Sequence, residues 1–491
     1  MLTTFSPRTY LLLPLAGMLL LSSACMVGPN YKRPAAPVPQ TYKEPPPAGW
    51  KEAQPNDGVI RGKWWEIYND PELNALEDQV SITNQNVLAA EAQYRAAEYS
   101  ARIARSALFP TVGAGPSISS TARSNTLFNT KVGNITNGVL TSYNFAGNVS
   151  YLADVWGDIR RTVRANEEIA QATYAQLENA RLAFQAELAS DYFQLHGTDG
   201  DLDLLQRTVA SYQDYLVLTQ NRYKSGVASG ADVAQAEAQL ETTRAQLVDL
   251  RVARAQFEHA IAMLTGKPPA AVTVPALLLK TPPPPVPVTV PSTLLERRPD
   301  IAAAERQMAS VHEQIGIAQA AFYPALNFTA SAGFQSSDVT KWFTWPSHIF
   351  SVSPQALETI FEGGRRRATV AQAKALFDSS VATYRQTVLA AFQQVEDNLV
   401  ALRVLEEEAA VTDRAVKAAE DSLNISTYQY KAGTVAYLQV LIAQATALAA
   451  ERSAVDLLTR RMVASVLLVE ALGGGWDAST MPTAQEILHV Q

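Results

Sequence analysis

The sequence offers few residues whose type and spacing could support catalysis. Its histidines are scattered over 491 residues, at positions His196, His259, His312, His348 and His489. His312 and Glu313 begin the pattern of a zinc-protease helix, but Gly316 stands where that pattern requires its second histidine. The segment Thr265–Lys267 (TGK) lacks the rest of a phosphate-binding loop. These residues predict no catalytic site, no cofactor and no metal centre, so we expect a protein that is not an enzyme.

Cys25 is the one residue in a recognisable modification pattern. It is the only cysteine, which excludes an intrachain disulfide framework. The apolar run Tyr10–Leu21 precedes it, too short for a membrane span and typical of a signal peptide, so we predict a signal peptide over residues 1–24. The pattern predicts a bacterial lipobox, in which the thiol of Cys25 receives diacylglycerol. Because Ser22 stands where a lipobox usually has a large aliphatic residue, cleavage without lipidation also fits.

Composition narrows the class of protein. Hydrophobic residues make up 47% of the chain and charged residues 18%, which is ample for a large folded body. The net charge of −7 and the absence of a dense basic block argue against a nucleic-acid partner. No later segment has an unbroken apolar run of about 20 residues, the length of a membrane-spanning helix. If the mature protein crosses a membrane, we therefore expect it to use strands.

Two proline-rich stretches divide the chain. The first, Pro29 to Pro47, predicts an extended segment poor in packed structure, so residues 25–71 are interpreted as an N-terminal tether. The second, Pro282 to Pro291, cannot lie inside a helix and separates two halves, residues 72–281 and 282–491.

The two halves are predicted to be copies of one unit. The segment Arg222–Gly226 (RYKSG) matches Gln429–Gly433 (QYKAG), and the same offset pairs further identical residues along the chain. Upstream, ARSALFP ending at Pro110 resembles AQAAFYP ending at Pro324. An ungapped match over this length indicates an internal duplication.

Long helices are predicted in each half. No proline occurs from Asp158 to Ser225, and apolar residues recur there at helical spacing, among them Leu177, Phe184, Leu188 and Leu195. A continuous helix of this length would reach on the order of 100 Å. We expect Gly197 and Gly200 to interrupt it. The apolar stripe by itself does not distinguish an ordinary helical bundle from a tunnel.

Between the helices lie stretches in which apolar and small polar residues alternate. They predict one β-hairpin at about 111–153 and another at about 325–358, each strand with one apolar and one polar face. Charged residues are almost absent, and each strand is roughly ten residues long, as in outer-membrane barrels. A soluble hairpin packed on helices remains the alternative.

About four strands per chain cannot close a barrel, because such barrels need at least eight. An open edge in lipid would leave unpaired backbone groups that cost several kcal/mol each. Two chains would supply eight strands, whose side chains nearly fill the lumen. Three chains would supply about twelve and leave a passage. The strand count therefore favours a homotrimer.

Several motifs resemble one known family: CMVGPNYKRP (Cys25–Pro34), WWEIYNDPEL (Trp64–Leu73), DVWGDIR (Asp154–Arg160), ERRPDI (Glu296–Ile301), FEGGR (Phe361–Arg365) and ALGGGW (Ala471–Trp476). Together they cover nearly all of the mature chain. They are similar to motifs of the TolC-type outer-membrane factors, in the lipoprotein branch that serves RND-type tripartite drug-efflux pumps.

The resemblance implies a mixed, mainly α fold: a trimeric outer-membrane β-barrel with four strands per chain and twelve in total, continued by a long α-helical barrel. It implies a lipid-anchored protein in the outer membrane of a Gram-negative bacterium, with its helices in the periplasm. The implied partners are outer-membrane lipid, a periplasmic adaptor (membrane fusion protein) and an inner-membrane RND-type pump. The implied function is a passive exit duct for drugs or other small toxic compounds.

Site residues are carried over from the family motif by motif. In the family the helical tips meet the adaptor and hold a closed iris. The residues expected at these adaptor-contact tips are Lys224, Gly226, Lys431 and Gly433. The candidates for hydrogen bonds that keep the tunnel shut are Tyr223, Asp232, Gln429 and Tyr430. The alternative for the two tyrosines is simple packing between helices.

Leu438 and Ile442 match the inward-facing constriction positions of the family. Relatives often have an acidic residue where this chain has Ile442, so an acidic ring is not expected. Threefold symmetry would instead form apolar rings, which hinder water and ions by dewetting. A periplasmic adaptor-like coiled-coil lipoprotein is the alternative function, although an adaptor would not be expected to carry duplicated lipid-facing hairpins.

Overall fold

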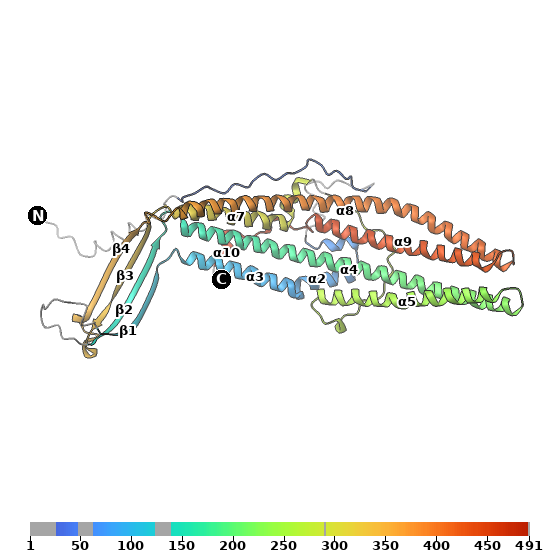
Figure 1. Ribbon diagram of the computed structural model, residues 1–491, viewed down its shortest axis with the longest axis horizontal. Helices are drawn as coiled ribbons and strands as arrows, with labels where there is room; N and C mark the ends of the chain where they lie inside the picture. Colours follow the sequence, from blue (N-terminus) through green and yellow to red (C-terminus); the bar gives the residue numbers. More distant parts are fainter. Residues whose placement is uncertain (1–25, 48–61, 123–138, 289–290, 490–491) are drawn as a thin grey trace.

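The structure, a computed structural model, describes residues 26–47, 62–122, 139–288 and 291–489. The molecule is elongated, with a four-stranded sheet at one end and two helical hairpins reaching the other (Figure 1). Cys25 and the predicted signal peptide lie outside the described residues. Within the described part of the chain, no helix has the length and apolar character needed to cross a membrane.

The first half contains the helices and strands α2 (Pro71–Thr83), α3 (Gln85–Ser106), β1 (Thr111–Ala122), β2 (Val139–Ala153), α4 (Asp158–Lys224) and α5 (Gly230–Leu264). The second half contains α6 (Leu294–Arg297), α7 (Pro299–Ala320), β3 (Ala325–Ser336), β4 (His348–Leu357), α8 (Arg365–Lys431), α9 (Tyr437–Ala471) and α10 (Ala484–Leu488). Short 3-10 helices are η2 (Trp64–Tyr68), η3 (Pro269–Ala271), η4 (Pro291–Thr293), η5 (Val339–Lys341), η6 (Trp345–Ser347) and η7 (Ala478–Thr480).

The duplication extends to element lengths. Helices α4 and α8 both have 67 residues, and α5 and α9 both have 35. Helices α3 and α7 both have 22. Each long helix starts after a left-handed glycine, Gly157 with φ 83° and Gly364 with φ 87°. Because glycine has no Cβ, these two positions turn the chain sharply from strand to helix.

The expected interruption of α4 at its glycines is wrong, because the helix is continuous from Asp158 to Lys224. Both glycines instead lie where α9 approaches closely. A Cβ atom at Gly197 would lie 2.2 Å from Thr459 Oγ1, and one at Gly200 would lie 3.1 Å from Val455 Cγ1. The glycines therefore serve packing between helices rather than a break in the backbone.

The four strands form one antiparallel sheet in the order β1-β2-β3-β4. Two hairpins, one from each half, are joined through β2 and β3, where Phe145 lies opposite Phe334. The sheet extends beyond the helices and does not cover them (Figure 1). Strands β1 and β4 are its outer strands, and each has one edge without a partner strand in the described chain. The predicted four-stranded arrangement is confirmed, and the alternative of a hairpin packed on helices does not hold.

The main hydrophobic core lies in the middle of the helical part. Fully buried residues from both halves meet there, among them Trp64, Leu73, Tyr192, Val388 and Leu468. A second, smaller cluster lies near the tips of the two helical hairpins and includes Tyr212, Leu240, Tyr430 and Val440. The duplicated halves thus share one core and do not form two separate domains.

Residues 26–47, which we call the strap, are extended without helix or strand. The expectation that this segment is poor in packed structure is wrong. Tyr31 and Tyr42 pack against the main core, and the strap follows the helices over much of their length (Figure 1).

Candidate gate at the helical tips

Two turns form the end of the molecule opposite the sheet (Figure 1). Helix α4 ends at Lys224 and α8 ends at Lys431, and both lysines are exposed. The following glycines have positive φ, 74° at Gly226 and 78° at Gly433. The backbone N–H of Gly226 donates to the carbonyl of Tyr223 at 2.9 Å, a contact typical of a helix that stops and reverses.

The two equivalent tyrosines of the repeat have different environments. Tyr223 is 54% exposed, whereas Tyr430 is 3% exposed. The ring of Tyr430 packs against Tyr437, with ring centres 5.5 Å apart. Its hydroxyl donates to Thr219 Oγ1 at 3.4 Å, which is a long hydrogen bond. Tyr430 therefore lies in the core of its own chain, and Tyr223 remains available at the surface.

Arg222 links the two helical hairpins, although it is not among the candidates expected from the sequence. Its Nη1 donates to the carbonyl of Tyr430 at 2.9 Å and to that of Lys431 at 3.3 Å. Its guanidinium carbon lies 4.6 Å from the centre of the Tyr430 ring. A cation at the last carbonyls of α8 is favoured by the helix dipole, and its position over an aromatic ring adds attraction. The sequence contained a signal in the repeat, because Arg222 occupies the position of Gln429 in motifs that share their tyrosine, lysine and glycine.

A second bond joins the same helices one and two turns further from the tip. The hydroxyls of Tyr215 and Thr427 lie 2.8 Å apart. Gln429 itself is exposed. Within the chain, the tips of α4 and α8 are therefore joined through Arg222 and Tyr215. The role expected of Tyr223, Asp232, Gln429 and Tyr430 in closing the tunnel stays a prediction.

Asp232 is placed at the start of α5. Its Oδ2 accepts a hydrogen bond from the backbone N–H of Ser229 at 2.9 Å, and its own N–H donates to Ser229 Oγ at 3.2 Å. This reciprocal capping box satisfies two backbone donors that the helix leaves free. The equivalent helix α9 starts after Ala436 and has no side-chain cap. The carboxylate of Asp232 thus has a local structural partner, and α9 begins without this stabilisation.

The two constriction candidates lie one turn apart on α9. Leu438 is 50% exposed and Ile442 is 59% exposed. The chain's own described residues leave these apolar side chains uncovered at the tip. Spacing of four residues puts them on one face of the helix.

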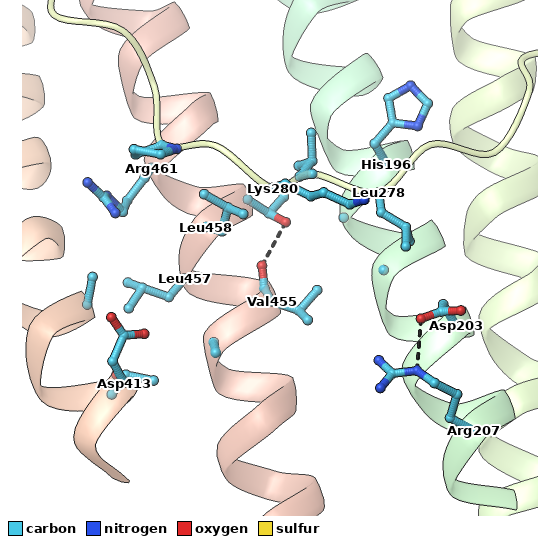
Figure 2. Close-up of a pocket in the computed structure, with 18 residues that line it drawn as sticks. His196, Asp203, Arg207, Leu278, Lys280, Asp413, Val455, Leu457, Leu458 and Arg461 are labelled. Atoms are coloured by element: carbon cyan, nitrogen blue, oxygen red, sulfur yellow. Dashed lines mark hydrogen bonds and ion pairs between the residues drawn. The ribbon is translucent and has the colours of Figure 1, made fainter. Parts of the chain in front are cut away.

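A pocket of about 560 Å³ lies further from the tips, between α4, α8, α9 and the segment around Lys280. We call the segment between α5 and α6, to which Val274 and Lys280 belong, the connector. Figure 2 shows the ion pair of Asp203 and Arg207 on one side and Asp413 on the other. The pair is 3.0 Å long and largely exposed. The pocket lining mixes solvated charges with aliphatic side chains such as Leu457 and offers no convergent acid–base arrangement among the described residues.

The histidine at this pocket has a structural partner. His196 Nδ1 lies 3.1 Å from Asp199 Oδ2, and Arg254 Nε donates to Asp199 Oδ1 at 2.6 Å. The same groups hold the connector, since Arg254 Nη2 donates to the carbonyl of Val274 at 2.7 Å. Hydrogen bonds from the His196 ring and the Arg254 guanidinium lower the pKa of Asp199 despite its burial. This network fastens the connector to the helices.

Comparison with known proteins gives one consistent answer. The family profile described as "Outer membrane efflux protein" matches residues 76–267 and 290–474. The chain belongs to the outer membrane efflux protein family. The two matched segments correspond to the two structural halves, so the predicted duplication is confirmed.

Named relatives and solved structures agree with this assignment. The chain is 30% identical to the probable efflux pump outer membrane protein TtgC of Pseudomonas putida, over 97% of this chain and 98% of the relative. It is 30% identical to the outer membrane protein OprJ of Pseudomonas aeruginosa, over 92% and 94%. The structure resembles the outer-membrane channel OprN with a TM-score of 0.83 and 26% identity, over 92% of this chain and 100% of that one.

The Campylobacter jejuni CmeC channel shares the fold with a TM-score of 0.85 at 23% identity, over 94% of this chain and 97% of that one. This family consists of outer-membrane efflux channels and not of enzymes. The protein is therefore an outer-membrane channel component of an efflux pump in a Gram-negative bacterium, and the adaptor-like alternative does not hold.

Proposed function

We propose that this efflux channel works as a homotrimeric, passive exit duct. The observation that carries the proposal is the pair of sheet edges on β1 and β4 that have no partner strand within the described chain. In lipid, every unpaired backbone group costs several kcal/mol, so the edges must be covered. Pairing β1 of one copy with β4 of the next closes the sheet, and three copies leave an open lumen where two would not.

The helices support the same arrangement. Four of the exposed apolar residues of α8 are separated by multiples of seven residues, at Leu376, Val404, Val411 and Ile425. On the opposite long edge, α3 and α5 also expose apolar residues, among them Tyr99, Ile103, Val248 and Val252 (Figure 1). Heptad spacing is typical of helices that pack side by side over long distances. In the trimer, α8 of one copy packs against α3 and α5 of the next.

The exported compounds are small toxic molecules, such as antibiotics and organic solvents. Support comes from relatives named as an antibiotic efflux pump protein and a toluene efflux pump protein, each 30% identical to this chain over 97% of its length. A duct needs few selective contacts, so the specificity and the energy belong to an inner-membrane pump of the RND type. A periplasmic adaptor contacts the tips, at the exposed Lys224 and Lys431 beside the two turn glycines.

The closed state is held at these tips. Three copies bring Leu438 and Ile442 together as apolar rings, which exclude water and ions without any charged group. Arg222 holds the end of α8 against α4 within each copy. A diacylglycerol group on Cys25 anchors the trimer to the outer membrane.

Single-channel conductance in planar bilayers tests the gate. Wild-type protein should conduct weakly, because the apolar rings exclude ions. Ile442→Asp and Leu438→Ala should each raise conductance several-fold, because they hydrate or widen the constriction. Arg222→Met should raise the open probability, because it removes the hydrogen bonds that tie α8 to α4.

Arg207→Met is the matched control, since Arg207 lies on the same helix in an exposed pair away from the tip. It should leave conductance unchanged. Conductance that stays at the wild-type value in all three tip variants would exclude this gate.

A further inference from the structure

Arg161 is a charged residue with no exposure to solvent, in the first turns of α4. Its Nη1 donates to Glu313 Oε2 on α7 at 2.6 Å. Its remaining donors point to the strap: Nε donates to the carbonyl of Val27 at 2.6 Å, and Nη2 to the carbonyl of Pro29 at 3.2 Å. A buried guanidinium without partners is costly, so these carbonyls are part of its required environment.

The backbone of the strap fits closely against this ion pair. Gly28 has φ 105°, and a Cβ atom there would lie 2.7 Å from the Cα of Gly316. A Cβ atom at Gly316 would in turn lie 2.2 Å from Arg161 Nε. Two glycines therefore let the strap, the guanidinium and α7 stack in direct contact. This accounts for the glycine that follows His312 and Glu313 at the position where a zinc-protease motif would have histidine.

Further contacts fix the strap along both halves of the molecule. The N–H of Val27 donates to the carbonyl of Trp156 at 3.0 Å, at the junction between β2 and α4. Tyr31 donates to Glu305 Oε1 at 2.6 Å. Arg33 Nη2 donates to the hydroxyl of Tyr384 on α8 at 2.9 Å.

The far end of the strap is held in the same way. The backbone N–H groups of Lys43 and Glu44 donate to the two carboxylate oxygens of Glu396, at 2.7 and 2.8 Å. Arg403 Nη2 lies 2.8 Å from Glu44 Oε2. Polar contacts of the strap thus come from α4 of the first half and from α7 and α8 of the second.

We propose that the strap is an intramolecular peptide ligand whose receptor is the Arg161–Glu313 pair, and that its binding holds the mature N-terminus at the strand–helix junction. The part that concerns the membrane rests on the proposed lipidation of Cys25. Because Cys25 directly precedes Met26, at most about 3.8 Å of backbone separates it from the bound strap. The lipid anchor and the helical body then move together, which a flexible tether would not allow.

Trypsin cleavage after Lys32, in the full-length protein purified from membranes, tests the strap. Gly28→Ala places a side chain at positive φ and against Gly316 without leaving any charge unpaired. It should speed cleavage about tenfold, because proteolysis follows the population of the open state and the strained side chain favours that state. Gly62→Ala is the matched control, since Gly62 also has positive φ but a Cβ atom there would meet no described atom within 4 Å. It should leave the rate after Lys32 unchanged.

Equal cleavage rates in wild-type protein and Gly28→Ala would overturn the assignment. Cys25→Ser should keep wild-type protection, because the Arg161–Glu313 pair and not the lipid binds the strap. Loss of protection in this variant would also overturn the assignment. Mass spectrometry of the wild-type N-terminal peptide reports lipidation separately. An unacylated Cys25 would refute the anchoring role, and protection after Lys32 would still report on the strap.

Discussion

Buried charged side chains in this protein have two different environments. Arg161 is paired with one carboxylate and two backbone carbonyls. Glu77 on α2 is 0% exposed, and neither of its carboxylate oxygens has a hydrogen-bond partner among the described residues. Burial, with a smaller effect from the Asp78 carboxylate, raises the pKa of Glu77 well above 4.5. The folded protein therefore keeps the proton on Glu77 at pH values where the unfolded chain has lost it.

This difference predicts a pH dependence of stability. As pH rises above 4.5, the unfolded chain releases the proton and the folded chain does not, so the free energy of unfolding falls until the folded-state pKa is passed. Each unit by which burial raises a pKa corresponds to about 1.4 kcal/mol. Glu77→Gln removes this loss. Its Tm, relative to wild type, should rise as pH increases from about 4 to about 8 in thermal unfolding followed by circular dichroism.

The matched control is Glu91→Gln, because Glu91 is exposed on α3. Its Tm should follow the wild-type curve at every pH. Parallel Tm curves for Glu77→Gln and wild type would show that Glu77 is ionised in the folded protein, against this prediction.

At the scale of elements, the close approach of α4 and α9 depends on the absence of one side chain. Helix propensity alone would favour alanine over glycine at position 197 by about 1 kcal/mol. The Cβ atom, however, would meet Thr459 Oγ1 at 2.2 Å. Overpacking of this kind typically costs about 1–3 kcal/mol, so the clash should outweigh the gain in propensity.

Gly197→Ala should therefore lower Tm by several degrees. The double variant Gly197→Ala with Thr459→Ala should recover most of this loss, because the atoms nearest to the added methyl group are removed. The measurement is a double-mutant cycle of Tm values. An increase of Tm in Gly197→Ala alone would mean that α4 and α9 move apart without cost.

At the scale of the whole molecule, a single copy exposes apolar residues on its helices that other copies would cover in the proposed trimer. Val411 on α8 is 56% exposed in the single chain, where a charged substitution would change stability by less than about 0.5 kcal/mol. In the proposed trimer the same residue is buried between copies. Val411→Asp should therefore weaken assembly without unfolding the chain.

Native mass spectrometry and heat-modifiable migration in gels measure this effect. Wild-type protein should be a trimer, and Val411→Asp should shift it toward monomer or lower the temperature at which the trimer dissociates. Val339→Asp is the control, since Val339 is 57% exposed in the loop between β3 and β4, away from the helical edges. A monomeric wild-type protein would refute the shared barrel.

Short-range patterns in the sequence determined much of this architecture. Alternating small and apolar residues predicted both hairpins, and the repeated RYKSG and QYKAG motifs placed both turns, where Gly226 and Gly433 do have positive φ. The duplication predicted halves that prove equal in helix length. The strands and turns depend on residues close in sequence, and the duplication follows from comparing the two halves, so both can be recognised in a single sequence.

Only the tertiary structure decided which of two equivalent tyrosines is buried and whether a glycine in a helix interrupts it or allows close packing. Tyr223 and Tyr430 have the same motif, but Tyr430 is buried in the cluster that includes Tyr212 and Leu240, and Arg222, 208 residues away in the chain, lies against its ring and carbonyl. Likewise, the sequence predicts that Gly197 interrupts the helix, whereas in the structure it allows Thr459 to approach closely. The sequence predicts a loosely packed tether for the strap, because the partners that bind it, Arg161 and Glu396, lie far along the sequence. Packing between distant segments has no local signature, and it therefore required the folded structure.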